Sequence, residues 1–388
     1  MSIGKVIAQQ MENASWIRRM FEIGAQMKRE RGEANIFDFT LGNPFGEPPP
    51  EVLAALRRVV EENRPRSHAY MPNAGYPAVR GALAAQLARR TGLPYTADHI
   101  LMTVGSAGAL NVVLKSLLDP GDEVILLAPF FPEYQFYIEN HGGRMVLVET
   151  DAAFQPDLER LAAAITPRSK AIILNSPNNP TGAVYSAEFL RGLEALISSC
   201  HYPITVIADD AYRSLTFDGL RLPEVPVLIR RAVVAYSWSK TLAMPGERIG
   251  CLALSPRLPE VEPLHNACTF ANRTLGFVNA PAIWQWVMLD VAELEIDPAP
   301  YQERRDLLWG ALTAMGYEIE KPRGAFYMFP RTPLRDDVAF VRRLMDYGIL
   351  AVPGSGFGRG GHIRLSLTLP LQAIERSLDG FGQALRRT

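Results

Sequence analysis

The sequence is poor in cysteine, lacks long hydrophobic runs and carries almost no net charge, and each of these features excludes a class of protein. Its three cysteines in 388 residues show no Cys-x-x-Cys spacing, which excludes a disulfide framework and a thiolate metal site. No apolar run approaches the roughly 20 residues of a membrane span, and the amino terminus shows no secretion signal. The 40 Lys and Arg balance 41 Asp and Glu to a net charge of -1. We therefore expect a cytoplasmic protein with no metal site, no membrane contact and no nucleic-acid partner.

The chain is long enough, and apolar enough, for two domains. Apolar residues make up 48% of it, and a domain typically takes about 150 residues. Three consecutive prolines at 48–50 and the Asp-Pro-Ala-Pro run at 297–300 mark boundaries, because proline interrupts helices and central strands. We expect an N-terminal arm at 1–50, a large domain at 51–296 and a small domain at 297–388.

Seven short apolar runs lie between residues 100 and 254, several of them separated by helical stretches. Because the runs are rich in Val and Ile and apolar on both faces, they predict a mostly parallel seven-stranded sheet flanked by helices, which is an α/β fold. Beyond residue 296, three helices and four short strands predict a smaller α+β unit. The seven runs are 100–104, 124–128, 145–148, 171–175, 204–208, 232–236 and 251–254; the later helices are 301–315, 337–347 and 371–385, and the later strands 317–319, 325–329, 350–352 and 363–366.

Unusual polar residues follow several of these runs, where an open α/β sheet binds its ligands. A small-residue turn at 105–110 opens a helix whose free N–H groups suit a phosphate, although a plain tight turn would have the same sequence. The turn at 175–182 holds three asparagines, which in turns commonly bond their own backbone. Asp209 leaves a buried strand and needs a partner, either a helix N-terminus or the cationic group of a ligand.

Lys240 follows the run at 232–236. A lysine in such a place is usually a solvated surface charge. Here Ser237 and Ser239 flank it, and Arg248 follows within an apolar stretch. A desolvated lysine has a lowered pKa and can form a Schiff base with a carbonyl group. Together with Asp209 and the phosphate-binding groups, this pattern describes a site for pyridoxal 5'-phosphate.

Several motifs occur in an order that is typical of one family. Ser-x-Ser-Lys followed by Gly-Glu-Arg-Ile-Gly spans 237–250, and Gly-Ser-Ala-Gly-Ala, Asn-Asn-Pro-Thr-Gly and Asp-x-Ala-Tyr precede it, as does a Tyr-to-Arg segment at 70–80. With these motifs the chain resembles, over nearly its whole length, the class I/II aminotransferases of pyridoxal-phosphate fold type I, the aspartate aminotransferase superfamily.

The resemblance implies a role for each residue around the cofactor ring. Lys240 would be the Schiff-base lysine and would move the proton between the substrate α-carbon and the cofactor. Asp209 would pair with the pyridinium nitrogen and so maintain the ring as an electron sink. Tyr212 and Asn179 would bond the ring's phenolic oxygen, and Phe131 would stack on the ring face.

The resemblance also implies how the phosphate is bound and how the chain assembles. Backbone N–H groups, two hydroxyls and one guanidinium would bind the phosphate. Tyr70 would reach the phosphate from the neighbouring subunit, which implies a homodimer. The phosphate ligands of the same subunit would be Ser106, Ala107, Ser237, Ser239 and Arg248.

Arg364 would bind the substrate α-carboxylate, alongside Gly42 and Asn179. A Gly-x-Gly-x-x-Gly match at 356–361 precedes Arg364. A dinucleotide site would need a helix directly after these glycines, whereas a strand is expected there, so we interpret the match as a loop.

Side-chain specificity is left open by the sequence. Some members of the family bind a distal carboxylate with a second arginine, and Arg273 does not align clearly with that position. The arm, which covers the substrate pocket in the family, contains Trp16 and Ile17. These would favour an apolar or aromatic substrate, or else belong to an amphipathic helix packed on the partner subunit.

Three functions remain. The first is amino transfer between an amino acid and a 2-oxo acid by a ping-pong mechanism through aldimine, quinonoid and ketimine intermediates. The second is a carbon–sulfur β-lyase or another carbanion-type reaction with the same cofactor. The third is a non-catalytic regulator that binds the cofactor, which we disfavour because such regulators carry a helix-turn-helix domain and the short arm leaves no room for one.

Overall fold

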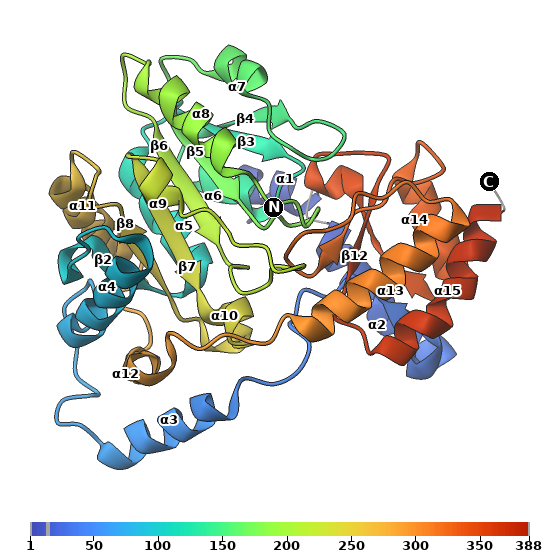
Figure 1. Cartoon of the computed structure of the whole chain (residues 1–388), viewed down its shortest axis with the longest axis horizontal. Helices are drawn as coiled ribbons and strands as arrows, with labels where there is room; N and C mark the ends of the chain where they lie inside the picture. Colours follow the sequence, from blue (N-terminus) through green and yellow to red (C-terminus); the bar gives the residue numbers. More distant parts are fainter. Residues whose placement is uncertain (1, 13–15, 387–388) are drawn as a thin grey trace.

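The computed structural model describes residues 2–12 and 16–386, without the side chains of 9, 12, 16–19 and 21. Within these residues the main sheet has seven strands in the order β2-β8-β7-β6-β5-β3-β4 (Figure 1). All neighbours are parallel except β8, which is antiparallel to both β2 and β7. The predicted mostly parallel sheet is therefore confirmed. Its strands are β2 (Ile100–Thr103), β3 (Glu123–Ala128), β4 (Arg144–Glu149), β5 (Ser169–Asn175), β6 (Thr205–Asp210), β7 (Ala232–Ser237) and β8 (Gly250–Leu254).

Helices cover both faces of this sheet, which explains why its strands are apolar on both sides. Successive side chains of a strand point to opposite faces. Ile173 of β5 packs in a cluster with α5, α6 and α11, whereas Ile172 packs on the other face with α7 and α8. Nearer β2, that second face is covered by α3, α4 and α12. The helices are α3 (Pro50–Glu62), α4 (Pro77–Thr91), α5 (Gly105–Leu117), α6 (Glu133–Asn140), α7 (Leu158–Ala164), α8 (Ala187–Ser198), α9 (Val225–Leu228), α10 (Trp238–Thr241), α11 (Val261–Thr274) and α12 (Ala282–Val291).

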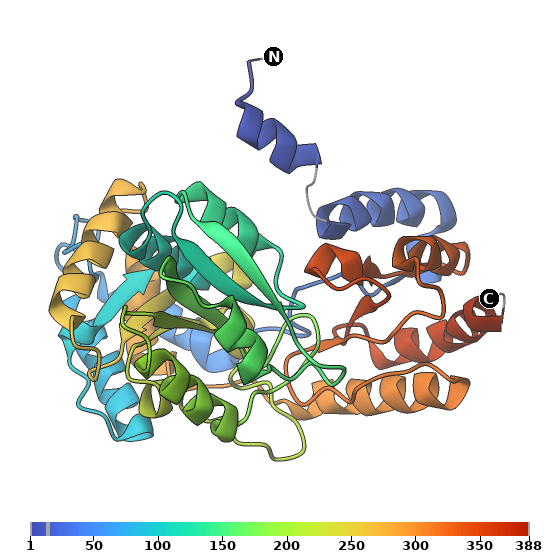
Figure 2. The same cartoon turned by 90° about the horizontal axis from the view of Figure 1, so that it is seen from above.

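The two ends of the described chain pack together in a second unit. Strand β1 (Phe37–Asp38) pairs in parallel with β10 (Ile349–Leu350), and β12 (Ile363–Ser366) lies between β11 (Val352–Pro353) and β9 (Tyr327–Met328). Figure 2 shows helix α2 lying alongside the C-terminal elements, and Met20, Met27 and Phe39 share one hydrophobic core with them. The helices of this unit are α2 (Trp16–Arg31), α13 (Ala299–Met315), α14 (Asp337–Asp346) and α15 (Leu371–Arg386), while α1 (Lys5–Glu12) lies apart from it.

One predicted element was wrong. Residues 317–319 form no strand in the described structure. Helix α13 ends at Met315 with Gly316 as its C-cap, and the N–H of Tyr317 donates to the carbonyl of Leu312 in the last turns of that helix. The Tyr317 hydroxyl donates to the carbonyl of Phe381. Its backbone is therefore used to terminate a helix and is not available for pairing in a sheet. The domain boundaries near residues 50 and 296 remain a prediction.

Candidate active site

Residues from both units meet beyond the carboxyl ends of β5, β6 and β7. Lys240 lies in α10, directly after β7, and its Nζ donates to the carbonyl of Gly42 at 2.5 Å. Arg364 on β12 donates through Nη1 to Oδ1 of Asn179 at 3.1 Å and through Nη2 to the carbonyl of Thr40 at 2.9 Å. The structure thus brings together the segment at 40–42, the loop after β5, helix α10 and strand β12.

The environment of Lys240 favours its uncharged form. Burial, together with the positive charges of Arg248 and Arg364, lowers the pKa of Lys240 to about 8. The amine also lies 5.5 Å from the centre of the Phe326 ring. A lysine with such a pKa has a substantial unprotonated fraction near neutral pH, so it can act as a nucleophile or a base.

Asp209, the last but one residue of β6, is a buried carboxylate with 7% of its surface exposed. Its Oδ2 accepts a hydrogen bond from the Tyr134 hydroxyl at 2.6 Å, whereas its Oδ1 has no hydrogen-bond partner among the described residues. Burial raises the pKa of Asp209 to about 6, against the opposing effect of the Tyr134 hydrogen bond. A buried carboxylate with one unpaired oxygen fits the protonated ring nitrogen of a pyridoxal group.

Tyr134 is a site residue that sequence reasoning missed. It lies on α6, one helical turn after Phe131, whose ring meets the Tyr134 ring edge-on with centroids 5.5 Å apart. The only signal in the sequence was this spacing, and a tyrosine in an apolar helix is ordinarily a core residue. Phe131 is half-buried and, through Tyr134, lies close to Asp209.

The N-terminus of α5 and Arg248 form a site suited to an anion. Helix α5 begins at Gly105, whose φ is +73°, and Ser106 and Ala107 follow in its first turn. A Cβ on Gly105 would lie 3.0 Å from Nη2 of Arg248, so glycine is what lets the guanidinium approach the helix end. The helix dipole and the guanidinium both favour negative charge at this point.

Two buried hydroxyls after β7 form a second group of polar atoms. The Ser237 hydroxyl donates to the Ser239 hydroxyl at 2.9 Å and accepts from the Ser239 N–H at 3.2 Å, which caps the short helix α10. These contacts fix the backbone immediately before Lys240. They also leave hydroxyl groups suitable for phosphate, so the residues present fit pyridoxal phosphate at each of its polar ends.

Two asparagines of the turn after β5 stabilise the turn itself, and the third faces the site. Asn175 accepts from the N–H of Asn179 at 2.8 Å and donates to the backbone carbonyl of Asp209 at 3.0 Å. Asn178 accepts from the Thr181 hydroxyl at 2.8 Å. These two asparagines shape the turn, whereas the side chain of Asn179 faces Arg364.

Aromatic rings enclose the rest of the cluster. The Arg364 guanidinium lies 4.4 Å from the centre of the Tyr327 ring and 4.9 Å from that of Phe357, and the residue is 2% exposed. Tyr212 is buried, with its ring centre 6.0 Å from that of Tyr327, and burial raises the pKa of its hydroxyl. Sequence reasoning missed Tyr327 and Phe357 because aromatic residues in such runs are typical of a core.

Two residues that the sequence raised, Tyr70 and Arg273, are not part of this cluster. Tyr70 is 93% exposed. Arg273 is exposed on α11, where its guanidinium lies 5.2 Å from the centre of the Phe270 ring, and Figure 1 shows α11 at the far end of the molecule from β12. The Trp16 side chain lies outside the described residues. The glycine-rich loop is followed by β12 and not by a helix, as expected.

Other features add no second chemical site to this description. The part of the chain that the structure describes holds no group of three or more His, Cys, Asp or Glu placed to bind a metal ion. None of its helices is long and apolar enough to cross a membrane. A cavity of about 1020 Å³ is lined by Phe154, Arg331, Arg359 and His362 rather than by the cluster, and its Arg331 and Arg359 are paired with carboxylates.

Comparisons with known proteins agree with this geometry. The model of the family aminotransferase class I and II matches residues 34–381. The chain is 34% identical over 373 residues to the aspartate/prephenate aminotransferase of Thermus thermophilus, and the alignment covers 93% of this chain and 94% of that protein. It is 31% identical over 355 residues to the aspartate aminotransferase of Geobacillus stearothermophilus, with 87% and 88% covered.

Solved structures agree as well. An aminotransferase from Eubacterium rectale is similar with a TM-score of 0.96 and 34% identity, over 100% of this chain and 99% of that one. A single mutant of Thermus thermophilus aspartate aminotransferase gives a TM-score of 0.89 and 31% identity, over 99% and 100%.

The fold and the site therefore define a pyridoxal-phosphate enzyme of fold type I. More narrowly, the chain belongs to the class I and II aminotransferases. It is an aminotransferase, its cofactor is pyridoxal phosphate, and enzymes of this family act on amino acids and oxo acids.

Proposed function

We propose that this protein transfers an amino group between an α-amino acid and a 2-oxo acid by a ping-pong exchange. The observation that carries the proposal is a lysine of lowered pKa, Lys240, in one cluster with a buried guanidinium, Arg364, whose Nε has no partner among the described residues. The bound cofactor would supply a carbonyl for the amine and an electron sink for the substrate. The chain would supply binding, orientation and proton transfer.

Each proposed role at the cofactor follows from the position of a side chain. Lys240 Nζ would hold the cofactor and later move a proton at the substrate α-carbon. Oδ1 of Asp209 would accept from the ring nitrogen, and Phe131 would cover the ring face. Tyr212 and Asn179 would orient the ring through its phenolic oxygen. The phosphate would bind to Ser106, Ala107, Ser237, Ser239 and Arg248.

Arg364 would bind the substrate carboxylate. A guanidinium that is 2% exposed and enclosed by two rings is desolvated, and a carboxylate would offset that cost by accepting two parallel N–H bonds. The carbonyl of Gly42 and the amide of Asn179 would also line the substrate site. Because Arg364 already donates to Asn179, the substrate would enter a partly organised site.

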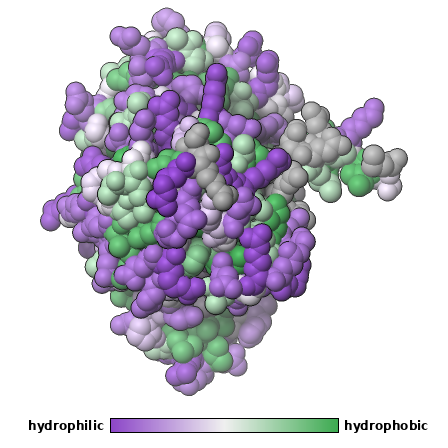
Figure 3. All heavy atoms as spheres, turned by 90° about the vertical axis from the view of Figure 1, so that its right-hand side faces the viewer, coloured by the Kyte–Doolittle hydropathy of each residue, from purple (hydrophilic) through white to green (hydrophobic). Residues whose placement is uncertain are grey.

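We also propose that the active unit is a homodimer to which Tyr70 contributes across the interface. Exposed apolar residues occur on α1 at Val6, Ile7 and Met11, on α3 at Leu53 and Val60, and on α11 at Phe270. Helices α3 and α11 lie at the end of the molecule opposite the C-terminal helices (Figure 1), whose side of the molecule is mainly hydrophilic (Figure 3). The exposed apolar residues of α3 and α11 support association through that end.

Mixing two inactive variants tests the position of Tyr70. In a dimer of a Lys240→Ala subunit with a Tyr70→Ala subunit, one site regains both native residues only if Tyr70 acts in its neighbour's site. We expect the mixture to recover activity after subunit exchange. Failure to recover it, in a mixture shown to form hybrid dimers, would contradict the shared site.

The boundaries of the units and the cellular location are further proposals. The shared core of residues near 20–39 with the C-terminal helices supports a small domain built from both chain ends, with a large domain at 51–296. Three free cysteines, two of them buried, support a reducing cytoplasmic location.

A half-reaction screen tests the function and its substrate class. Purified protein would be mixed with single amino acids, including aspartate, glutamate and the aromatic ones, while the absorbance of the cofactor is recorded. We expect conversion to the aminated cofactor together with one equivalent of 2-oxo acid. Sustained release of pyruvate and ammonia or sulfide without an acceptor would instead support a β-lyase. The names of the relatives make aspartate the first amino acid to include, and prephenate, a 2-oxo acid, the first acceptor to offer to the aminated form.

A further inference from the structure

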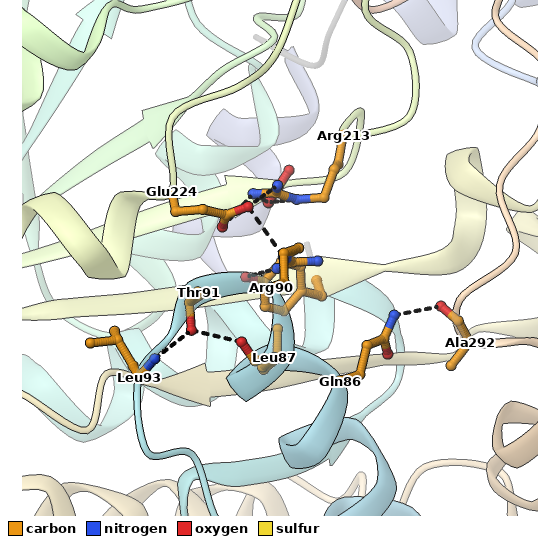
Figure 4. Close-up of polar contacts among 10 residues, drawn as sticks. Gln86, Leu87, Arg90, Thr91, Leu93, Arg213, Glu224 and Ala292 are labelled. Carbon is orange, nitrogen blue, oxygen red and sulfur yellow. Dashed lines mark hydrogen bonds and ion pairs between the residues drawn. The ribbon is translucent and has the colours of Figure 1, made fainter.

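A network of charged side chains lies behind Asp209, and the proposed function does not use it. Asp210 is the last residue of β6, so its side chain points to the face opposite that of Asp209. Nε of Arg213 donates to Oδ2 of Asp210 at 2.7 Å, and Nη1 of Arg213 donates to Oε1 of Glu224 at 2.7 Å. Nε of Arg90 lies 3.2 Å from the same Glu224 oxygen. Figure 4 shows Arg90, Arg213 and Glu224 pointing toward one another.

This network is connected to the strand that leads to Lys240. Nη2 of Arg90 donates to the Tyr236 hydroxyl at 2.6 Å, and Tyr236 on β7 is paired in register with Asp210 on β6. Arg213 and Glu224 are largely buried, with side-chain exposures of 15% and 18%. The four charged groups therefore lie against β6, which carries Asp209, and against β7, which leads into α10 and Lys240.

The charges of the network cancel. Asp210 and Glu224 carry two negative charges, and Arg213 and Arg90 carry two positive ones. Nε and Nη2 of Arg213 both lie within hydrogen-bond distance of Oδ2 of Asp210, at 2.7 Å and 2.6 Å, while Oδ1 of Asp210 has no hydrogen-bond partner among the described residues. As a result, Asp209 is the carboxylate near the end of β6 that has no cation paired with it among the described residues. The proposed function pairs it with a cationic ring nitrogen.

We propose that Arg213 is a positioning residue for the cofactor, which keeps Asp209 ionised by neutralising the adjacent Asp210. The inference rests on the proposed role of Asp209. Two neighbouring carboxylates at a buried strand end oppose each other's ionisation, and a guanidinium paired with one of them relieves that opposition.

The groups that face Asp209 from other elements do not replace this effect. They are Tyr134 and Tyr137 of α6, Ser106 of α5, and Tyr212 in the following turn. None of them is a cation, and the negative charge of Asp210 raises the pKa of Asp209. The ionisation of Asp209 therefore depends on the network behind it having no net charge.

The test compares two ligands of the apo-protein, pyridoxal phosphate and its analogue with carbon in place of the ring nitrogen. Only the first can bond Asp209 through nitrogen, so the ratio of the two dissociation constants reports on that bond. In Arg213→Met we expect the preference for pyridoxal phosphate to fall on the order of tenfold at pH 5, below the pKa of about 6 of Asp209, since one pKa unit there corresponds to a tenfold change in the ionised fraction of Asp209. In Arg213→Lys, and in the double variant Arg213→Met/Asp210→Asn, the preference should stay within about twofold of the wild type.

A purely structural role for Arg213 would weaken both ligands equally and leave the ratio unchanged, and that result would overturn the inference. A wild-type protein that shows no preference would instead refute the proposed role of Asp209. If Arg213→Met does not fold, the variant Asp210→Asn provides the test. Removing the charge next to Asp209 should lower, by about one unit, the pH at which the preference for pyridoxal phosphate is half-maximal. An unmoved midpoint would overturn the inference.

Discussion

The hydrogen bond from Tyr134 to Asp209 should make the stability of the apo-protein depend on pH in a way that one substitution can reveal. The folded-state pKa of Asp209 is raised from 3.8 to about 6. A group with a raised folded pKa stabilises the fold fully below its unfolded pKa and loses that contribution as the pH rises through the folded pKa. The free energy of unfolding of the apo-protein therefore falls as Asp209 ionises between about pH 4 and pH 6, and it stays lower by this amount above pH 6.

Tyr134→Phe should increase this cost at high pH. A hydrogen bond to an ionised group is worth about 1.5–3 kcal/mol, whereas one between neutral groups is worth about 0.5–1.5 kcal/mol. At pH 8, where Asp209 is ionised, we expect the free energy of unfolding to fall by the larger amount. At pH 5, where it is mostly protonated, we expect the smaller one. The corresponding rise in the pKa of Asp209 is roughly one unit.

Urea unfolding of the apo-protein at both pH values measures the difference. Tyr317→Phe is the matched control, because the buried Tyr317 hydroxyl donates to the neutral carbonyl of Phe381 at 3.0 Å. Its loss should be the same at pH 5 and pH 8. An equal loss for Tyr134→Phe at both pH values would refute the reasoning, since it would mean that the tyrosine bonds no ionised carboxylate.

Three further predictions concern the lysine, the arginine and the phosphate site. The rate at which the apo-protein forms a Schiff base with pyridoxal phosphate should rise with pH through about 8, the pKa of Lys240, since only the uncharged amine reacts; a half-maximal rate above pH 10 would contradict this, and Lys240→Ala should show no borohydride-reducible adduct. Arg364→Lys should lower kcat/KM for the amino acid by about 10- to 100-fold, because lysine cannot form the two-bond fork, with cofactor affinity unchanged; steady-state kinetics and a cofactor titration check both parts. Gly105→Ala should weaken cofactor binding, since its Cβ would press on Arg248, whereas Gly121→Ala is the control with a similar positive φ of +91° and open space around it; calorimetric titration of both apo-proteins would show equal affinities if the contact is unimportant.

The sequence missed several residues of the site for one physical reason. Tyr134 and Arg213 stand in segments whose own pattern is ordinary, and their importance depends on partners elsewhere. Tyr134 is 75 residues from Asp209 in the sequence. Arg213 bonds Asp210, three residues before it, and Glu224, eleven residues after it. A local pattern cannot show whether a buried tyrosine faces a carboxylate or another apolar side chain.

The sequence by itself determined the sheet and most of the proposed cofactor residues. The inner strands of the sheet are buried on both faces and must be apolar, so their runs were visible in the sequence, and the polar residues that follow them lie at the strand ends because chain order places them there. Tertiary structure alone decided which distant groups complete the site. Lys240 bonds a carbonyl 198 residues away, and Arg364 bonds one 324 residues away. Those contacts depend on the N-terminal segment packing with the C-terminal unit, and this packing creates the desolvation that lowers the pKa of Lys240 and encloses Arg364 between aromatic rings.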